Sequence, residues 1–188
     1  MRHAVVAQRV ARLPFQAEDA GSIPSSRLHF AVAEVAEVNW LLSAEHYLGP
    51  ASSASWCCAG FVDDTLVAAM VYRWPTARML PNDGTWLELS RWCLTPECGR
   101  NAGSRMMRWA ASQLRRAMPA TQTLVSYSDP GHGHTGALYR ASGWTSSPTH
   151  HQERLAANGV GYPSGHGSWD GLTIQKPKHR WLYPLVAQ

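Results

Sequence analysis

The spacing of apolar residues predicts three helices in the chain from residue 28 onward. Helical periodicity indicates the first over 34–47 and a stronger one over 101–118. The apolar stripe of the first consists of Val35, Val38, Leu41 and Leu42. The stripe that should face the core from the second consists of Met106, Met107, Ala110, Leu114 and Met118. A third, short helix is expected over 135–142, because Gly143 follows it where a left-handed C-cap is common.

Short runs of apolar and β-branched residues predict the strands. They lie at 28–32, 56–62, 66–74, 85–94, 123–128, 171–175 and 181–185. The second and third of these flank Asp63-Asp64 and should form a hairpin. The resulting order, β-α-β-β-β-α-β-α-β-β, is typical of a mixed α/β fold.

Composition indicates one soluble folded domain. The chain has 188 residues, of which 45% are apolar and 16% charged, the opposite of the balance in disordered proteins. No run reaches the roughly 18 apolar residues of a membrane helix, and no signal-peptide pattern is present. Four cysteines without a CxxC pair or zinc spacing are interpreted as reduced thiols of a cytoplasmic protein. Cys57 and Cys58, adjacent on a strand, should point to opposite faces.

The first 27 residues look unrelated to the rest. Residues 6–26 lack periodicity and resemble the translation of a tRNA gene, whose T-arm would read as Gly-Ser-Ile-Pro, here residues 21–24. We therefore expect residues 1–27 to be a non-native or disordered extension that can be deleted without preventing folding. The alternative is a basic arm that contacts nucleic acid.

Basic residues are concentrated in two stretches of a chain with a formal charge of +4. The first holds Arg100, Arg105, Arg108, Arg115 and Arg116, and the second Lys176, Lys178 and Arg180. A basic face suits a polyanion, either the phosphates of coenzyme A or those of DNA. The alternative is a solvated helix surface.

Residues 87–105 combine a strand, a small-residue loop and the start of a helix, which together make an anion site. The loop resembles the pyrophosphate loop of GNAT acyltransferases, whose pattern is Gln/Arg-x-x-Gly-x-Gly/Ala. Arg100 and Gly103 match it, whereas Arg105 stands where glycine or alanine is usual. The resemblance implies acetyl-CoA or a related acyl donor as cofactor. The residues implied to bind it are Cys98, Gly99, Arg100, Asn101, Ala102, Gly103, Ser104 and Arg105.

Residues 137–144 resemble a later GNAT motif, in which a helix carries a tyrosine and ends at glycine followed by an aromatic residue. In that family the tyrosine protonates the leaving CoA thiolate, which implies this role for Tyr139. The alternative is a half-buried structural tyrosine.

Several short patches between 44 and 185 resemble the phage Mom DNA-modification proteins. The patches are 46–47, 86–91, 126–129, 133–136 ahead of Tyr139, and 178–183. The resemblance implies a GNAT-like domain over 28–188, with a mixed, mostly antiparallel central sheet flanked by helices. It also implies conversion of the N6 amino group of adenine in double-stranded DNA to a carbamoylmethyl derivative. This modification protects a phage genome from restriction nucleases in its bacterial host.

The resemblance and the residue types together give seven candidate catalytic residues. They are His46, Tyr47, Glu88, Arg91, Ser126, Asp129 and Tyr139. His46 is expected to titrate near neutrality, as a general base or metal ligand, unless it is structural. Asp129 could accept a hydrogen bond from the adenine amino group, or simply form an Asp-Pro turn. Glu88 could be a general base, or pair with its strand neighbours Arg91 and Ser90.

Adenine lies inside the base stack, so an enzyme that modifies it must flip it out or act on an exposed base. The residues expected to hold the DNA phosphates are Arg108, Arg115, Arg116, Lys176, Lys178 and Arg180. That binding should weaken steeply with salt.

Six histidines invite a metal hypothesis: His132, His134, His150, His151, His166 and His179. None has the helical i,i+4 spacing or the carboxylate pattern of a defined site, so we assign no metal ligands and expect solvated loop residues. Iron is conceivable for the family's transfer, although the spacing does not support it. Two other functions are an acetyl-CoA-dependent N-acetyltransferase acting on a small amine or protein, and a DNA-binding module without catalysis.

Overall fold

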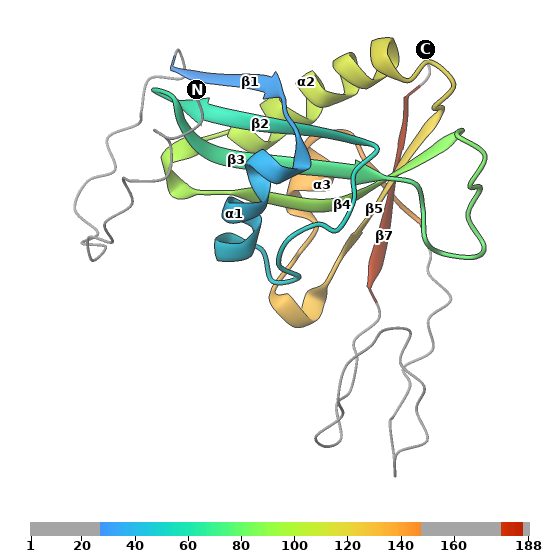
Figure 1. Cartoon of the computed structure of the whole chain (residues 1–188). Helices are drawn as coiled ribbons and strands as arrows, with labels where there is room; N and C mark the ends of the chain where they lie inside the picture. Colours follow the sequence, from blue (N-terminus) through green and yellow to red (C-terminus); the bar gives the residue numbers. More distant parts are fainter. Residues whose placement is uncertain (1–26, 148–177, 186–188) are drawn as a thin grey trace.

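The computed structural model describes residues 27–147 and 178–185 (Figure 1). Its elements are β1 (Leu28–Val32), α1 (Val35–Glu45), β2 (Trp56–Val62), β3 (Thr65–Arg73), β4 (Trp86–Leu94), the 3-10 turn Pro96–Cys98, α2 (Ala102–Ala117), β5 (Thr123–Ser128), the 3-10 turn Pro130–His132, α3 (Ala137–Ala141), β6 (Thr145–Ser147) and β7 (His179–Pro184). Residues 1–26 of the predicted extension 1–27, the predicted strand 171–175 and Lys176 lie outside the described residues.

The strands form one sheet in the order β1-β2-β3-β4-β5-β7-β6. Only β4 and β5 are parallel, and every other neighbouring pair is antiparallel. The prediction of a mixed, mostly antiparallel sheet is therefore confirmed. The short β6 was not predicted, because Thr145-Ser146-Ser147 has no apolar alternation.

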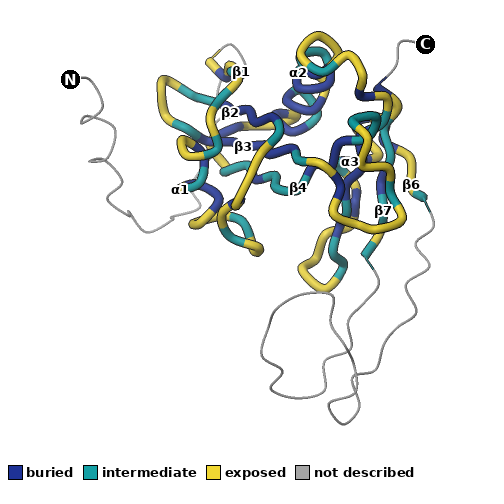
Figure 2. Tube along the Cα trace, turned by 45° about the vertical axis from the view of Figure 1, so that its right-hand side comes forward, coloured by how far each residue is buried: buried dark blue, intermediate teal, exposed yellow. Residues whose placement is uncertain are grey.

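The helices cover both faces of the sheet (Figure 1). The larger core includes Met106, Ala110 and Leu114 of the predicted α2 stripe, and Tyr139 of α3 joins the same core. A smaller core on the other face contains Val38, Leu41 and Leu42 of α1. Figure 2 shows the buried segments running through the central strands between these layers.

Local sequence accounts for the turns and helix ends. Asp63 and Asp64 both have positive φ, 47° and 64°, as a two-residue hairpin turn requires, so the predicted hairpin is confirmed. Glu34 and Glu37 form a reciprocal capping box at the start of α1. This helix ends at Glu45 rather than at residue 47, because His46 is extended and places Tyr47 in the following loop.

All four cysteines are buried and free. Cys57 packs in the α1-side core and Cys58 in the α2-side core, which confirms that they point to opposite faces. No helix among the described residues is long and apolar enough to cross a membrane.

Candidate active-site cleft

Strands β4 and β5 pair over only part of their lengths. Their ladder runs from Trp86 opposite Thr123 to Leu89 opposite Ser126 and then stops. Beyond it, β4 stays paired with β3 and β5 with β7. The two strands therefore diverge, and a cleft of about 520 Å³ opens at this point. Seven consecutive β4 residues, 88–94, line it.

A β-bulge in β4 sets which side chains face each side of this cleft. Val71 pairs with Arg91 but Tyr72 pairs with Leu89, so Ser90 is the extra residue, and its hydroxyl donates to the Val71 carbonyl at 3.1 Å. Because of this extra residue, Leu89 and Trp92 both pack on the α2 side. Arg91 belongs to the α1 side, where its Nε donates to the Gly49 carbonyl at 3.1 Å.

Tyr139 of α3 lines the cleft from inside an aromatic enclosure. Its ring stacks on Trp181 at 5.3 Å and meets Trp144 and Trp92 edge-on at 5.4 and 6.0 Å. Burial raises the pKa of Tyr139 to about 12, although the hydrogen bond with Ser126 opposes the shift. The phenol is therefore protonated throughout the neutral range.

The Tyr139 hydroxyl lies 2.8 Å from Ser126 Oγ. Ser126 uses its single proton to donate to the Leu89 carbonyl at 2.9 Å. The phenol must then be the donor in the Tyr139–Ser126 bond, so Ser126 fixes the position of the phenolic proton. The structure thus brings two predicted residues together at the point where β4 and β5 separate.

A cluster of four rings lies at the cleft, and three of them, His46, Tyr47 and His134, line it. His46, Tyr47, His132 and His134 are joined through Tyr47, whose ring lies 5.0, 4.1 and 5.2 Å from the three imidazoles in that order. Tyr47 is 38% exposed. This cluster presents an accessible aromatic surface beside the cleft.

His46 differs from expectation, because it does not titrate near neutrality. Burial, then the charges of Arg91 and His134, lower its pKa to about 4. Its Nδ1 accepts the Leu48 N–H at 3.1 Å, so in the neutral ring the proton resides on Nε2. The ring can donate a hydrogen bond at pH 7, but its accepting nitrogen is already occupied.

Replacing His46 by asparagine should flatten the acid dependence of stability. As pH falls from 6.5 to 4, the unfolded chain binds a proton at this position and the folded chain does not, so the free energy of unfolding decreases. The substitution removes this contribution, about 1–2 kcal/mol after discounting for partial exposure, and asparagine can still accept the Leu48 N–H. Urea unfolding of both proteins between pH 7 and 4 measures the difference. Parallel pH curves would contradict the lowered pKa.

Asp129 follows β5 and lies near the ring cluster. Its Oδ1 accepts the Gly131 N–H at 2.9 Å, which caps the 3-10 turn. Its Oδ2 lies 3.4 Å from His132 Nδ1 and 3.6 Å from Lys178 Nζ. Burial and, to a smaller extent, the charge of Asp129 raise the pKa of Tyr47. Asp129 therefore forms a turn and also carries a carboxylate beside the cleft.

Glu88 forms its ion pair with a partner that the sequence did not indicate. Arg73, opposite it on β3, donates to Glu88 Oε1 at 3.0 Å, and the Thr76 N–H donates to Oε2 at 3.3 Å. The partners considered from the sequence, Arg91 and Ser90, bond to backbone carbonyls instead. Arg73 is thus a cleft residue missed by the sequence analysis.

The formal charges that line the cleft are predominantly positive. Of the lining residues, Arg73 pairs with the one carboxylate, Glu88, and Lys178 pairs with Asp129 beside the cleft, which leaves the charge of Arg91 in excess. The lining therefore favours an anionic substrate over a cationic one.

The predicted anion loop 98–105 leads into α2. Cys98 is a core residue whose thiol donates to the Val67 carbonyl at 3.1 Å, so its side chain does not face a ligand. Gly99 and Asn101 both adopt positive φ, and Asn101 gives α2 no side-chain cap. The first amides of α2 have no acceptor within the helix and no cap from Asn101.

Gly103 is required for packing. A Cβ there would lie 2.7 Å from Leu138 Cδ2 and 2.9 Å from Trp92 Cζ2. Because glycine has no Cβ, the start of α2 can approach both α3 and β4. Of the other loop residues, Arg100 is exposed, Ala102 is buried, and Ser104 and Arg105 are half-buried.

The basic residues predicted to hold DNA do not form one group. Arg108, Arg115 and Arg116 are exposed on α2, and Arg115 Nε donates to the Leu185 carbonyl, just past the end of β7, at 2.7 Å. Lys178 precedes β7, so the two groups lie at opposite ends of a strand roughly 20 Å long. Arg180 donates to Ser147 Oγ at 2.8 Å.

No group of three or more histidine, cysteine, aspartate or glutamate residues is placed to hold a metal ion within 27–147 and 178–185. His150, His151 and His166 lie outside these ranges.

Comparison with known proteins assigns the chain to a family. The model of the Mom protein family matches residues 27–164. No curated protein matches the sequence.

Similar solved structures are acetyltransferases, at low sequence identity. The Bacillus subtilis acetyltransferase in complex with CoA has a TM-score of 0.54 and 14% identity over 85% of this chain and 99% of its own. The ribosomal-protein-S18-alanine N-acetyltransferase of Escherichia coli has a TM-score of 0.55 and 12% identity, covering 86% and 96%. The spermidine N-acetyltransferase of Vibrio cholerae, in complex with CoA and spermine, has a TM-score of 0.53 and 9% identity, covering 85% and 96%. The chain has the GNAT acetyltransferase fold and belongs to the Mom protein family.

Proposed function

We propose that this protein is a transferase that modifies the N6 amino group of adenine in DNA, using acetyl-CoA or a related acyl donor. The observation that carries the proposal is the cleft between β4 and β5, which has a protonated tyrosine, an accessible aromatic cluster and a cationic lining. Membership of the Mom protein family supports the same substrate.

The cleft fits an acyl-CoA donor on two observations. After Leu89, the β4 backbone groups on the β5 side have no strand partner, so an extended, amide-containing chain can pair with 90–94. At the start of α2, the uncapped amides after Asn101 can receive a phosphate. A bound acyl-CoA would supply the group to be transferred as an activated thioester.

Tyr139 is proposed as the general acid. Its raised pKa keeps a proton on the phenol oxygen at neutral pH, and Ser126 holds that oxygen at the separation of the strands. When the O–H turns from Ser126 Oγ toward a leaving thiolate, it can give up this proton, a contribution typically of 10²–10⁴ in rate.

The ring cluster around Tyr47 is proposed to receive the adenine. Base–aromatic stacking contributes about 1–3 kcal/mol per base, and Tyr47 is exposed enough to provide a face. The Asp129 carboxylate, near this cluster, is the proposed acceptor for the adenine amino group. Since that group lies inside the duplex stack, the base must first be extruded.

The charge of the cleft separates this proposal from an acetyltransferase acting on a small cationic amine. A polyamine would need carboxylates to bind it, whereas Glu88 is paired with Arg73 and Asp129 with Lys178, so the charge of Arg91 is left in excess. DNA would meet a complementary surface instead.

Nucleoside mass spectrometry of DNA from cells that express the protein tests the proposal. We expect a new modified deoxyadenosine with the wild type and a loss of at least tenfold with Asp129→Asn. Asparagine keeps the oxygen that accepts the Gly131 N–H, so this variant preserves the turn and replaces the other carboxylate oxygen, the proposed acceptor, by an NH2 donor. Unmodified DNA in cells shown to contain folded wild-type protein would reject the DNA substrate and favour acetylation of another amine.

A further inference from the structure

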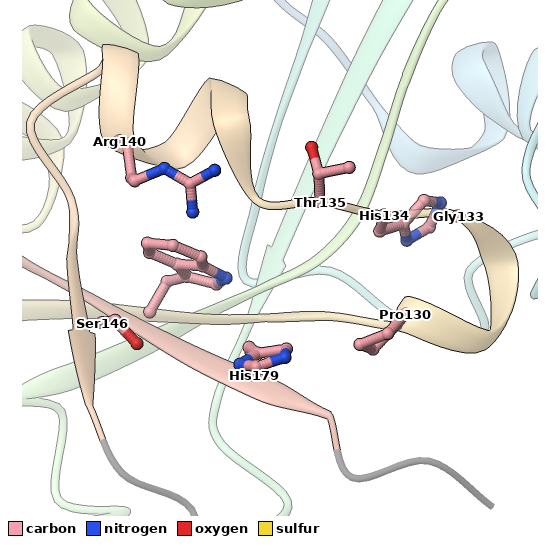
Figure 3. A pocket seen from close by; sticks show the side chains of 8 residues that line it. Pro130, Gly133, His134, Thr135, Arg140, Ser146 and His179 are labelled. Atoms are coloured by element: carbon pink, nitrogen blue, oxygen red, sulfur yellow. The ribbon is translucent and has the colours of Figure 1, made fainter.

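A second pocket, shown from close by in Figure 3, lies beside the cleft and shares three lining residues with it. Its volume is about 370 Å³, and its lining comprises Pro130, Gly133, His134, Thr135, Arg140, Ser146, His179 and Trp181. Tyr139 lines the cleft, whereas its stacked partner Trp181 lines this pocket. Residues 133–135 line both and form a common rim.

Arg140 is the cation of this pocket. Its guanidinium carbon lies 5.5 Å from the centre of the Trp181 ring. Trp181 is itself fixed, since its indole N–H donates to Ser128 Oγ at 2.9 Å and its ring stacks on Tyr139. Within the described part of the chain, Arg140 forms no ion pair and its side chain no hydrogen bond. A planar cation is thus held by its face, with its N–H donors available.

The rest of the lining suits an oxyanion. Figure 3 shows Thr135, His134 and Arg140 on one side of the pocket and His179 and Ser146 on the strands across from them. Hydroxyl and imidazole groups can donate to anionic oxygens, and none of the lining residues is acidic. Together, the guanidinium, hydroxyl and imidazole groups have the donors and the charge that bind a phosphate.

We propose that this pocket binds a backbone phosphodiester of DNA next to the target nucleotide. The assignment rests on the proposed function and adds to it the site that fixes the strand. The common rim 133–135 makes a group in the pocket an immediate neighbour of a base in the cleft. No residue of 98–105 or of α2 lines the pocket, so it is distinct from the place proposed for the CoA phosphates.

The test is binding of a short adenine-containing DNA duplex, measured by fluorescence anisotropy over a range of salt concentrations. Arg140→Gln should weaken binding about tenfold and reduce the slope of log affinity against log salt by about 1, as for one lost phosphate contact. Ser146→Asp, which places a carboxylate in the pocket and keeps Arg140, should weaken binding in the same direction. Arg27→Gln is the matched control. It removes one positive charge at β1, the opposite edge of the sheet, and should leave affinity and slope unchanged.

The outcomes separate this inference from the proposed function. Suppose that the wild type binds and modifies DNA, and that the Arg140→Gln and Ser146→Asp variants unfold cooperatively and bind DNA like the wild type. The pocket assignment is then overturned, while the proposed function stands. If either variant loses CoA binding and keeps DNA binding, the phosphate site belongs to the cofactor and the assignment is again overturned. If wild-type protein neither binds nor modifies DNA, the proposed function fails and this inference fails with it.

Discussion

Replacing Tyr139 by phenylalanine is expected to lower the yield of modified deoxyadenosine about 100-fold while the protein stays folded. Phenylalanine keeps the stack on Trp181 and the edge contacts with Trp92 and Trp144. The substitution removes one hydroxyl, and Ser126 retains its bond to the Leu89 carbonyl. The stability cost should therefore be only about 1 kcal/mol, that of one buried hydrogen bond.

Two measurements check this expectation: nucleoside mass spectrometry for yield and thermal unfolding for stability. Tyr183→Phe is the matched control, because Tyr183 packs against the same Trp144, at 5.6 Å, but does not line the cleft. It should keep full activity. A Tyr139→Phe protein within threefold of wild-type yield would show that the phenol is not the general acid.

Gly136→Ala should be the most destabilising single-methyl change in the described chain, by about 3 kcal/mol or more. Gly136 has a φ of 72°, which costs an L-residue about 1 kcal/mol. In addition, its Cβ would lie 2.8 Å from Trp181 Cε2 and closer still to Cζ2. Trp181 cannot move freely, because Tyr139 and Ser128 hold it. Overpacking therefore adds to the backbone strain.

Gly133→Ala separates the two costs. Gly133 has nearly the same φ, 74°, but a Cβ there meets nothing within 4 Å. This control should lose only about 1 kcal/mol in urea unfolding. Equal losses for the two variants would mean that the Trp181 contact contributes nothing. Since Gly136 supports the wall between the cleft and the second pocket, its variant should also lose modification activity.

Local patterns were enough to predict the main helices and the hairpin. The α2 stripe follows from helical periodicity, and the turn at Asp63 and Asp64 follows from residues that tolerate positive φ. Both depend on neighbours in sequence. The edge strand β6 was missed for the converse reason, since its three small polar residues are extended only because they pair with β7.

The candidate site was predicted in part, because its residues come from distant elements. Ser126 and Tyr139 were both selected, but nothing in the sequence indicated which of the nine tryptophans would enclose the phenol. The pairing of Glu88 with Arg73 depends on strand register. The lowered pKa of His46 depends on burial and on charges from β4 and the loop after β5. None of these is a property of a local sequence window.

The short ladder between β4 and β5 also bears on the order in which the chain acquires structure. Strands β1 to β4 each pair with the next strand along the chain, and the connections between these four strands have 23, 2 and 12 residues (33–55, 63–64 and 74–85). On its far side, β5 pairs with β7, whose partners such as Ser128 and His179 are more than fifty positions apart. Closing a longer loop costs more chain entropy and slows pairing. During synthesis the β1–β4 half can therefore assemble while the partner of β5 is still untranslated, and the candidate active-site cleft forms last.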